Sequence, residues 1–498
     1  MIRRLLVANR GEIAIRIIRA CRELGIETIA VYSEADRRSP HAAAADRAVL
    51  IGPPPAGESY LAIDRLIDAA RREGADAVHP GYGFLAENAA FAARCADAGL
   101  VFVGPTPEAI EQMGSKIAAR HSAHEAGLAT VPGETPVTKD AESLRAAASR
   151  VGYPLIVKAS AGGGGKGMRV VTDPSALDEA ISSARHEARS AFGDDTVYFE
   201  RKLERPRHIE VQVVGDATGR VVHLFERDCS TQRRHQKIIE ESPSPALTDG
   251  LRRRMGEAAA ALARHIGYRN AGTIEFLVEG AGEAAAFYFL EMNTRLQVEH
   301  PVTELVTGVD LVHAQLRVAS GGTLPWMQSD LAQRGHAIEC RIYAEDPANG
   351  FLPQAGRLSV YREPHGPGIR VDSGVVEGGE VSIYYDPMLA KLIGYGETRE
   401  IARLRLVAAL RRYPVLGIRT NIPFLVRVLE DERFIDGAID TAYLEREGAG
   451  LCSERVGPSL AAALAGAVAF DPSATSGTLS PPLAVVPDPW DRLKGWRN

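Results

Sequence analysis

The sequence lacks the features that mark secreted, membrane-embedded and nucleic-acid-binding proteins. Its five cysteines stand alone, without a C-x-x-C pair, which argues against a disulfide framework and a cysteine-based zinc site. The longest apolar run near the C-terminus, residues 460–470, is far shorter than the roughly 20 residues that a membrane helix needs. The formal net charge is −6 and there is no long basic run, so neither nucleic acid nor an anionic membrane is expected as a partner. We therefore expect a cytoplasmic protein with reduced thiols.

Two common phosphate-binding motifs are also missing. The turn after the first predicted strand reads NRGE, where a dinucleotide-binding domain has G-x-G-x-x-G. In the glycine tract AGGGGKGM, Gly167 follows Lys166 where a P-loop has serine or threonine, and a strand pattern follows instead of a helix. These differences argue against an NAD-binding domain and against a P-loop NTPase.

The chain is long enough for several domains, because 498 residues exceed the about 100 to 200 residues of a typical domain. Residues 1–113 alternate short apolar runs with helical patterns, which predicts a Rossmann-like domain with a parallel sheet. Residues 114–320 predict an antiparallel α+β domain, and residues 334–445 predict a third domain that closes with a helix. Residues 446–498, rich in Ala, Gly, Ser and Pro, predict a linker with a short helix at 460–468. The predicted fold class combines α/β and α+β.

The glycine tract lies between two apolar runs, PLIVKAS and MRVVT. Two strands that flank such a loop form a flap whose backbone N–H groups can close over phosphates. Lys158 stands at the end of the first strand, before Gly162, Gly163, Gly164 and Gly165. We interpret this segment as a lid on ATP; the alternative is a flexible surface loop.

A second group of polar residues lies on a predicted hairpin. GTIEFLV and FYFLEMN read as strands that are joined by the turn EGAGEAA. Because the midpoint between Glu275 and Glu291 falls in that turn, pairing brings the two carboxylates opposite each other, and Asn293 shares the face of Glu291. Hard oxygen ligands in this arrangement favour Mg²⁺; the alternative is a pair of solvated strand carboxylates.

The segment TRLQVEHP follows this hairpin directly. In an extended backbone, Arg295, Gln297 and Glu299 would point to one side, where arginine can clamp a small anion and glutamate can accept its proton. The run RDCSTQRRHQKIIEE contributes His235 and Lys237, which an anion beside ATP would require. The alternatives are a polar strand edge for the first segment and a solvated face for the second.

Together these segments closely resemble the biotin carboxylase component of biotin-dependent carboxylases, a group within the ATP-grasp superfamily. The resemblance covers about residues 1–445 and rests on VANRGEIAIRIIRA, HPGYGFLAEN, MGSK, VKASAGGGGKGMRVV, ERDCSTQRRHQKIIEESP, FLEMNTRLQVEHPVTE, IECRIYAEDP and YYDPMLAKLI. It implies ATP-dependent carboxylation of biotin at N1′ by bicarbonate through carboxyphosphate, with two Mg²⁺ or Mn²⁺ ions and a lid at about residues 130–203.

The resemblance also implies roles for individual residues. The nucleotide site would comprise Lys116, Lys158 and Gly162, Gly163, Gly164 and Gly165 at the phosphates, Glu200, Arg201 and Leu203 by the adenine, and His208, Gln232 and His235 along its wall. The metal ions would be held by Glu275, Glu291 and Asn293. Bicarbonate would be bound by Lys237, Arg295, Gln297 and Val298 and deprotonated by Glu299, while Arg341 would stabilise the enolate form of biotin. Arg201 stands where the bacterial enzymes commonly have lysine.

Partners follow from the same resemblance. No Met-Lys-Met biotinylation sequence occurs in the chain, so biotin is expected on a separate carrier protein or carrier domain, and a carboxyltransferase is expected to be a further partner. Arg19 and Glu23 match positions used for dimerisation in the family, which predicts a homodimer. The end, PDPWDRLKGWRN, resembles the start of the segment that follows this module in long α chains, so residues 446–498 are either a linker or the truncated start of a next domain.

Two other functions compete with this interpretation. Another ATP-grasp ligase, such as a purine-pathway carboxylase or a carbamoyl-phosphate-synthetase-like enzyme, would share the lid and the metal ligands but lack the set Arg295, Glu299 and Arg341. A catalytically silent ATP-binding regulator would have lost a metal ligand or the base, and the sequence retains both.

Overall fold

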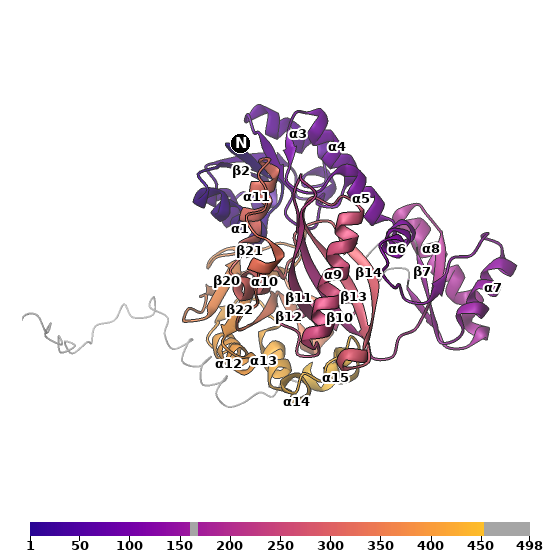
Figure 1. Ribbon diagram of the computed structural model, residues 1–498. Coiled ribbons are helices and arrows are strands. Elements are labelled where there is room, and N and C mark those ends of the chain that lie inside the picture. Colours follow the sequence, from indigo (N-terminus) through magenta and orange to yellow (C-terminus); the bar gives the residue numbers. More distant parts are fainter. Residues whose placement is uncertain (160–167, 453–498) are drawn as a thin grey trace, which may run out of the picture. The chain divides into compact units, whose positions relative to one another are not determined.

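The first sheet of the protein is parallel and carries its helices as crossover connections (Figure 1). A computed structural model describes residues 1–159 and 168–452, which fall within one unit, Met1–Cys452. The predicted glycine lid loop, Gly162 to Gly165, and the predicted helix at 460–468 lie outside the described residues.

The strand order of this sheet is β3-β2-β1-β4-β5, and every neighbouring pair is parallel. This confirms the parallel α/β arrangement that the alternating pattern predicts at the N-terminus. The strands are β1 (Arg4–Val7), β2 (Glu27–Ser33), β3 (Arg47–Gly52), β4 (Ala77–His79) and β5 (Val101–Phe102). The helices are α1 (Gly11–Glu23), α2 (Pro40–Ala44), α3 (Ile63–Arg72), α4 (Ala89–Asp97) and α5 (Pro107–Gly114).

A small antiparallel sheet forms the body of the predicted lid. Its order is β6-β9-β7-β8, and β7 pairs with β8 across the glycine tract, with Val157 opposite Arg169. The predicted pair of flanking strands is therefore present. A separate apolar core joins this sheet to two helices. The elements are β6 (Gly133–Glu134), α7 (Ala141–Val151), β7 (Leu155–Ala159), β8 (Arg169–Val171), α8 (Leu177–Phe192) and β9 (Val197–Arg201).

The largest sheet has eight strands in the order β14-β13-β10-β11-β12-β15-β22-β20. It is antiparallel and continuous across the second and third predicted segments, because β12 pairs with β15. Its strands are β10 (Arg207–Gly215), β11 (Val221–Arg233), β12 (Gln236–Ser242), β13 (Asn270–Glu279), β14 (Ala286–Asn293), β15 (His336–Tyr343), β20 (Ile369–Ser373) and β22 (Met388–Gly396). Short two-residue strands pair outside this sheet: β16 (Glu345–Asp346) with β17 (Leu352–Pro353), β18 (Gly356–Arg357) with β21 (Glu380–Val381), and β19 (Val360–Tyr361) with β23 (Val415–Leu416).

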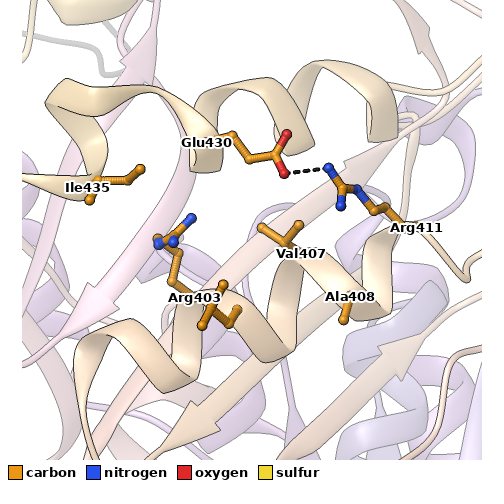
Figure 2. A pocket seen from close by; sticks show the side chains of 7 residues that line it. Arg403, Val407, Ala408, Arg411, Glu430 and Ile435 are labelled. Carbon is orange, nitrogen blue, oxygen red and sulfur yellow. Dashed lines mark hydrogen bonds and ion pairs between the residues drawn. The ribbon is translucent and has the colours of Figure 1, made fainter. Parts of the chain in front are cut away.

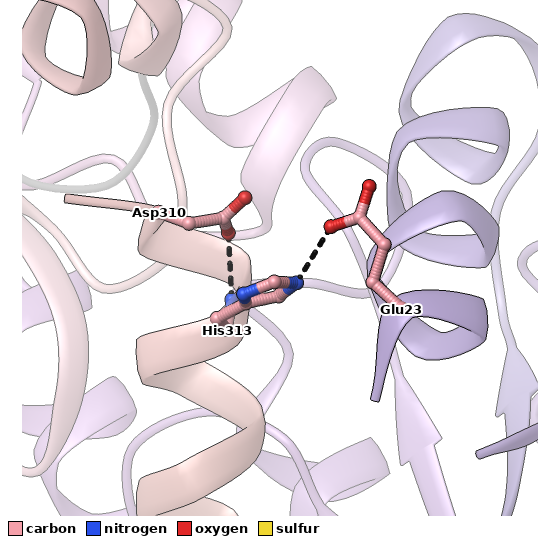
Figure 3. Close-up of side chains that lie close together, drawn as sticks. All are labelled: Glu23, Asp310 and His313. Atoms are coloured by element: carbon pink, nitrogen blue, oxygen red, sulfur yellow. Dashed lines mark hydrogen bonds and ion pairs between the residues drawn. The ribbon is translucent and has the colours of Figure 1, made fainter. Parts of the chain in front are cut away.

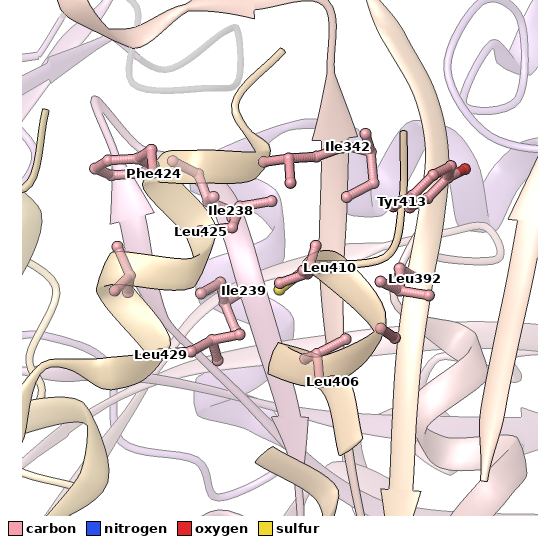
Figure 4. Packing of buried hydrophobic residues seen from close by; sticks show 14 of the residues in the cluster. Ile238, Ile239, Ile342, Leu392, Leu406, Leu410, Tyr413, Phe424, Leu425 and Leu429 are labelled. Carbon is pink, nitrogen blue, oxygen red and sulfur yellow. The ribbon is translucent and has the colours of Figure 1, made fainter. Parts of the chain in front are cut away.

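Alternate residues of β15 face two different helices, as the two-residue period of a strand requires. Ile338, Cys340 and Ile342 belong to the core under the C-terminal helices, where Leu406 and Leu425 pack (Figure 4). Ala337 packs instead against α10 on the other side. The remaining helices of the described chain are α6 (Lys116–Glu125), α9 (Asp249–His265), α10 (His300–Thr307), α11 (Leu311–Ala319), α12 (Arg399–Leu410), α13 (Ile422–Glu430), α14 (Glu432–Ile435) and α15 (Tyr443–Cys452).

Helix α15 continues past residue 445, where the change in composition predicts the end of the folded segment. It reaches Cys452 and lies against β11 and α13. Since Tyr443 and Leu444 are buried in the core of the C-terminal helices, packing extends the helix into a sequence whose composition resembles a linker.

Polar contacts tie helix α11 to helix α1. Asp310 caps α11 by accepting the backbone N–H of His313, and the His313 ring lies 3.0 Å from the Glu23 carboxylate (Figure 3). Arg16, buried on α1, pairs with Asp310 at 2.7 Å and with Glu304 of α10 at 2.8 Å. These contacts hold the parallel N-terminal sheet against the helices that follow the candidate site.

Candidate active site

The paired carboxylates predicted from the hairpin lie where the sequence places them. Strands β13 and β14 pair with Glu275 directly opposite Glu291 and with Asn293 opposite Thr273. The Asn293 amide donates to Glu275 Oε1 at 2.8 Å. Three polar groups therefore converge on one face at the end of this hairpin.

Lys237 is the central cation of the site. Its ammonium group lies 2.5 Å from Glu210, 2.8 Å from Glu275 and 2.7 Å from Glu299. Burial by itself would lower the pKa of Lys237, but the three carboxylates outweigh it and raise the pKa well above the usual range. Lys237 therefore stays charged, and each of its three donors is directed at one of these carboxylates, so an anion bound to Lys237 would take the place of one of them.

Glu299 lies between two cations. One carboxylate oxygen contacts Lys237, and the other accepts a hydrogen bond from Arg341 at 3.0 Å. Burial favours the neutral acid, yet Lys237 and Arg341 prevail and keep the pKa of Glu299 well below its usual range. The residue is thus ionised at neutral pH and has a free lone pair that can accept a proton.

The backbone after Asn293 is not extended, so the predicted strand geometry of residues 295 to 299 is wrong. Strand β14 ends at Asn293, and a turn leads into α10, which has Glu299 as its N-cap residue and Pro301 in its first turn. Arg295 nevertheless donates to Gln297 and to Asn293, each at 3.1 Å. The side chains meet because the turn folds back, not because they alternate along a strand.

On the nucleotide side, two lysines predicted to bind phosphate lie together. Lys158 at the end of β7 pairs with Glu200 at 2.5 Å, and Lys116 donates to the carbonyl of Ala159 at 3.4 Å. Burial and the charge of Lys158 lower the pKa of Lys116. Arg120 also pairs with Glu200. The four glycines predicted beside them lie outside the described residues.

The other predicted nucleotide contacts surround the same region. Leu203 and Gln232 are buried, and His208 forms an ion pair with Glu275 at 2.8 Å. Residues 234 and 235 form the two-residue turn between β11 and β12, and His235 there has a φ of 65°. Burial lowers the pKa of His235, and the nearby charges of Lys158 and His208 lower it further.

Arg201 at the end of β9 makes both backbone and side-chain contacts. Its N–H donates to Pro132 at 2.8 Å, and its guanidinium pairs with Glu279 at 2.9 Å. Val298 uses its carbonyl to accept a hydrogen bond from Lys391 at 2.9 Å.

The donor set at the hairpin fits a divalent cation. Burial and the charge of Glu275 raise the pKa of Glu291, which is the electrostatic conflict that a divalent cation relieves. Within residues 1–159 and 168–452, Glu275 also belongs to a convergent set with His208 and Glu210, whereas Glu291 belongs to no such set. Oxygen ligands of this kind suit Mg²⁺.

Comparisons with known proteins agree over most of the described chain. Residues 1–110 match the family model for the biotin carboxylase N-terminal domain, residues 115–327 that for the ATP-binding domain of the carbamoyl-phosphate synthase L chain, and residues 339–446 that for the biotin carboxylase C-terminal domain. Biotin carboxylase of Haemophilus influenzae is 52% identical over 448 residues, which cover 90% of this chain and 99% of that protein. The chain belongs to the biotin carboxylase family.

Other relatives extend this result. Biotin carboxylase 1 of Bacillus subtilis is 50% identical over 445 residues, which cover 89% of this chain and 98% of that protein. The biotin carboxylase domain dimer of Hydrogenobacter thermophilus 2-oxoglutarate carboxylase, solved with MgADP, ADP and bicarbonate, is 45% identical with a TM-score of 0.87, covering 91% of this chain and 99% of that one. Membership in the biotin carboxylase family confirms the resemblance, the fold class and the activity, ATP-dependent carboxylation of biotin.

Several residues of this biotin carboxylase site were missed by sequence reasoning. Glu87, within the HPGYGFLAEN segment, accepts from Arg295 at 2.8 Å and from the backbone of Thr294 at 3.1 Å. Glu240 accepts from Arg341 at 2.6 Å. The fully buried Arg227 pairs with Glu210. The sequence gives little indication of such ion pairs, because a carboxylate and its arginine partner are separated along the chain.

No helix among the described residues of this biotin carboxylase family member is both long and apolar enough to cross a membrane.

Proposed function

We propose that the residues described above perform the steps of this carboxylation, in which biotin is carried by a separate protein or domain and bicarbonate and ATP are the other substrates. The observation that carries the proposal is the position of Glu299: its carboxylate lies between Lys237 and Arg341, and Lys237 also contacts Glu275 of the paired carboxylates. A base, an anion-binding cation and a metal-binding pair thus share one buried cluster.

ATP would bind between the lid and the largest sheet. Lys116 and Lys158 would contact its phosphates together with the loop Gly162 to Gly165, and Glu200, Arg201 and Leu203 would surround the adenine. His208, Gln232 and His235 would line the remaining wall. The buried pair of Lys158 with Glu200 supports this assignment, since ATP phosphates can replace a carboxylate as the partner of the lysine.

Bicarbonate would bind beside Glu299, held by Lys237, Arg295, Gln297 and the backbone of Val298. The side-chain amide nitrogen of Gln297 is buried and has no hydrogen-bond partner among the described residues, which leaves its two N–H donors for an anion. Glu299 then removes the bicarbonate proton, and the carbonate oxygen attacks the γ-phosphate of ATP. This step yields carboxyphosphate and ADP.

Glu275, Glu291 and Asn293 would hold Mg²⁺, whose charge would offset the negative charge of the ATP phosphates during transfer. Carboxyphosphate then releases CO₂ and phosphate, and the phosphate takes the proton from N1′ of biotin. Arg341 would stabilise the enolate that results, and N1′ then bonds to CO₂. Lid closure excludes water, which would otherwise hydrolyse carboxyphosphate.

The division into three domains, residues 1–113, 114–320 and 334–445, is part of the same proposal, and so is a lid over residues 130–203.

We assign a biotin carrier and a carboxyltransferase as partners of this chain. The carboxyltransferase would determine the acyl acceptor, and an acetyl-CoA acceptor would place the enzyme in fatty acid biosynthesis. Residues Arg19 and Glu23, about half exposed, support a homodimer, and the reduced thiols support a cytoplasmic location.

The proposed reaction can be tested with isotopically labelled bicarbonate. Purified protein with ATP, Mg²⁺, labelled bicarbonate and free biotin should transfer label into an acid-labile biotin adduct. The matched control omits ATP. Label in biotin that does not depend on ATP, or no label at all with ATP consumed, would contradict the proposed function.

A further inference from the structure

Lys391 is a fully buried lysine that none of the proposed steps uses. It lies on β22 directly opposite Arg341 of β15. Because cross-strand partners point to the same face of a sheet, both cations extend toward the turn that carries Glu299. Burying an ammonium group is costly unless several acceptors surround it, so its contacts indicate what it stabilises.

Three acceptors surround the Lys391 ammonium group. The carbonyl oxygen of Val298 accepts at 2.9 Å, Glu12 of α1 lies at 3.3 Å and Asp372 of β20 at 3.8 Å. Asp372 also forms an ion pair with Arg370 at 2.7 Å, so Asp372 would still have a cationic partner if Lys391 were replaced. The contact with Val298 is the one that reaches the active-site turn.

This turn needs an external anchor because it is neither helix nor strand. Its carbonyl at Gln297 accepts a weak hydrogen bond from the backbone of His300 at 3.4 Å and one from the His300 ring at 2.8 Å. Lys391 holds the next carbonyl, that of Val298, and Arg341 holds the next side chain, that of Glu299. Two neighbouring cations therefore fix consecutive residues of the base-bearing turn.

We propose that Lys391 is a positioning residue for the reaction: by holding the Val298 carbonyl, it sets the distance between the Glu299 carboxylate and the bicarbonate proton. The inference rests on the proposed role of Glu299 as the base. Glu12, which also accepts a hydrogen bond from the Tyr82 hydroxyl, extends the anchor to the N-terminal domain. Lys391 is not among the residues proposed above to contact ATP, bicarbonate or biotin.

The test compares Lys391→Met with the double variant Lys391→Met/Glu12→Gln and with Lys391→Arg. The single change leaves Glu12 as a buried carboxylate without its lysine, which can impair folding, whereas the double variant removes both charges. In the double variant, kcat for biotin-dependent phosphate release should fall roughly 10²-fold, as expected when a catalytic group is misplaced by about 1 Å. Binding of a fluorescent ADP analogue should be unchanged, and Lys391→Arg should restore part of kcat.

The pH profile separates positioning from a merely structural role. At higher pH a larger share of the substrate pool is carbonate, which has no proton to remove. The difference between wild type and the double variant should therefore shrink as the pH rises. A deficit that stays constant with pH, or a double variant with wild-type kcat, would overturn the positioning role.

Arg403→Met is the matched control. Arg403 is another buried cation of the C-terminal segment, and it donates to the backbone carbonyl of Leu429 at 2.9 Å. It lines a surface pocket of about 410 Å³ whose lining residues include none from the turn that carries Glu299 (Figure 2). The kcat of the Arg403→Met variant should equal that of the wild type. Inactive wild-type protein would contradict the proposed function itself, whereas active wild type with an equally active double variant would contradict only the role of Lys391.

Discussion

The carboxylate of Glu299 and the guanidinium of Arg341 form a buried ion pair with an N–O distance of 3.0 Å. The proposed base and the cation proposed to face biotin are thus in contact before any substrate binds. Because Arg341 also pairs with Glu240, its orientation does not depend on Glu299 alone. Removal of the Glu299 charge should consequently affect proton transfer more than the shape of the site.

Glu299→Gln tests this directly. The amide cannot accept the bicarbonate proton, so turnover should fall by about 10² to 10⁴-fold, the usual contribution of a general base. ATP affinity, measured by titration with a fluorescent analogue, should be nearly unchanged, because Glu299 is not among the proposed nucleotide contacts. Loss of ATP binding would show that the residue has a different role.

Lys237→Met should destabilise the fold as well as the reaction. It leaves Glu210, Glu275 and Glu299 buried without their shared cation, and breaking a buried ion pair typically costs about 3–5 kcal/mol. Urea unfolding would measure the loss. Lys139→Met is the control: Lys139 is more than half exposed in its pair with Asp195, so the change should cost under about 1 kcal/mol. Equal unfolding midpoints for the two variants would contradict the role of Lys237 as the cation that stabilises the three buried carboxylates.

Glu291→Gln should have opposite effects on the free and the nucleotide-bound protein. Because burial and Glu275 raise the pKa of Glu291, loss of its charge should leave the melting temperature of the free protein unchanged or higher. The rise in melting temperature on adding Mg²⁺ and ATP should shrink, since binding stabilises in proportion to affinity. If the free Glu291→Gln variant melts well below the wild type, and Mg²⁺ and ATP raise its melting temperature as much as they raise that of the wild type, Glu291 is not a metal ligand.

Stability in acid should depend on Glu241 of β12. Burial opposes its ionisation, but His336 and Arg399 outweigh that effect and lower the pKa of Glu241 to about 2. A carboxyl group with a depressed folded-state pKa stabilises the fold above its unfolded value, near 4.5, and loses this contribution as the pH falls toward 2.

The consequence can be measured by comparing urea midpoints of wild type and Glu241→Gln at several pH values. The wild type should be more stable at pH 7, by on the order of 3 kcal/mol for a shift of this size. The gap should narrow between about pH 4.5 and pH 2. A gap independent of pH would mean that Arg399 and His336 do not hold Glu241 in its charged form.

The sequence predicts the hairpin of the site well because both strands and their turn are local. The two-residue period and the position of the turn are enough to put Glu275 opposite Glu291. The same period fails for residues 295 to 299, where Pro301 and the N-cap at Glu299 start a helix. An alternating polar pattern does not distinguish a strand from a turn that folds back on itself.

The partners of the site residues could not be predicted, because they come from distant segments. Glu87 and Thr294 are 207 positions apart, and Lys391 and Val298 are 93 positions apart. Which buried carboxylate meets which cation depends on the order of strands in the sheet, where β15 lies between β12 and β22. Local patterns contain no information on that order.

The most direct test of the account is phosphate release by the purified chain with ATP, Mg²⁺ and bicarbonate, measured with and without free biotin. Biotin carboxylation at this site should give slow phosphate release without biotin and a clear increase when biotin is added, with no increase in Glu299→Gln. Release that is the same with and without biotin would contradict biotin carboxylation by this site.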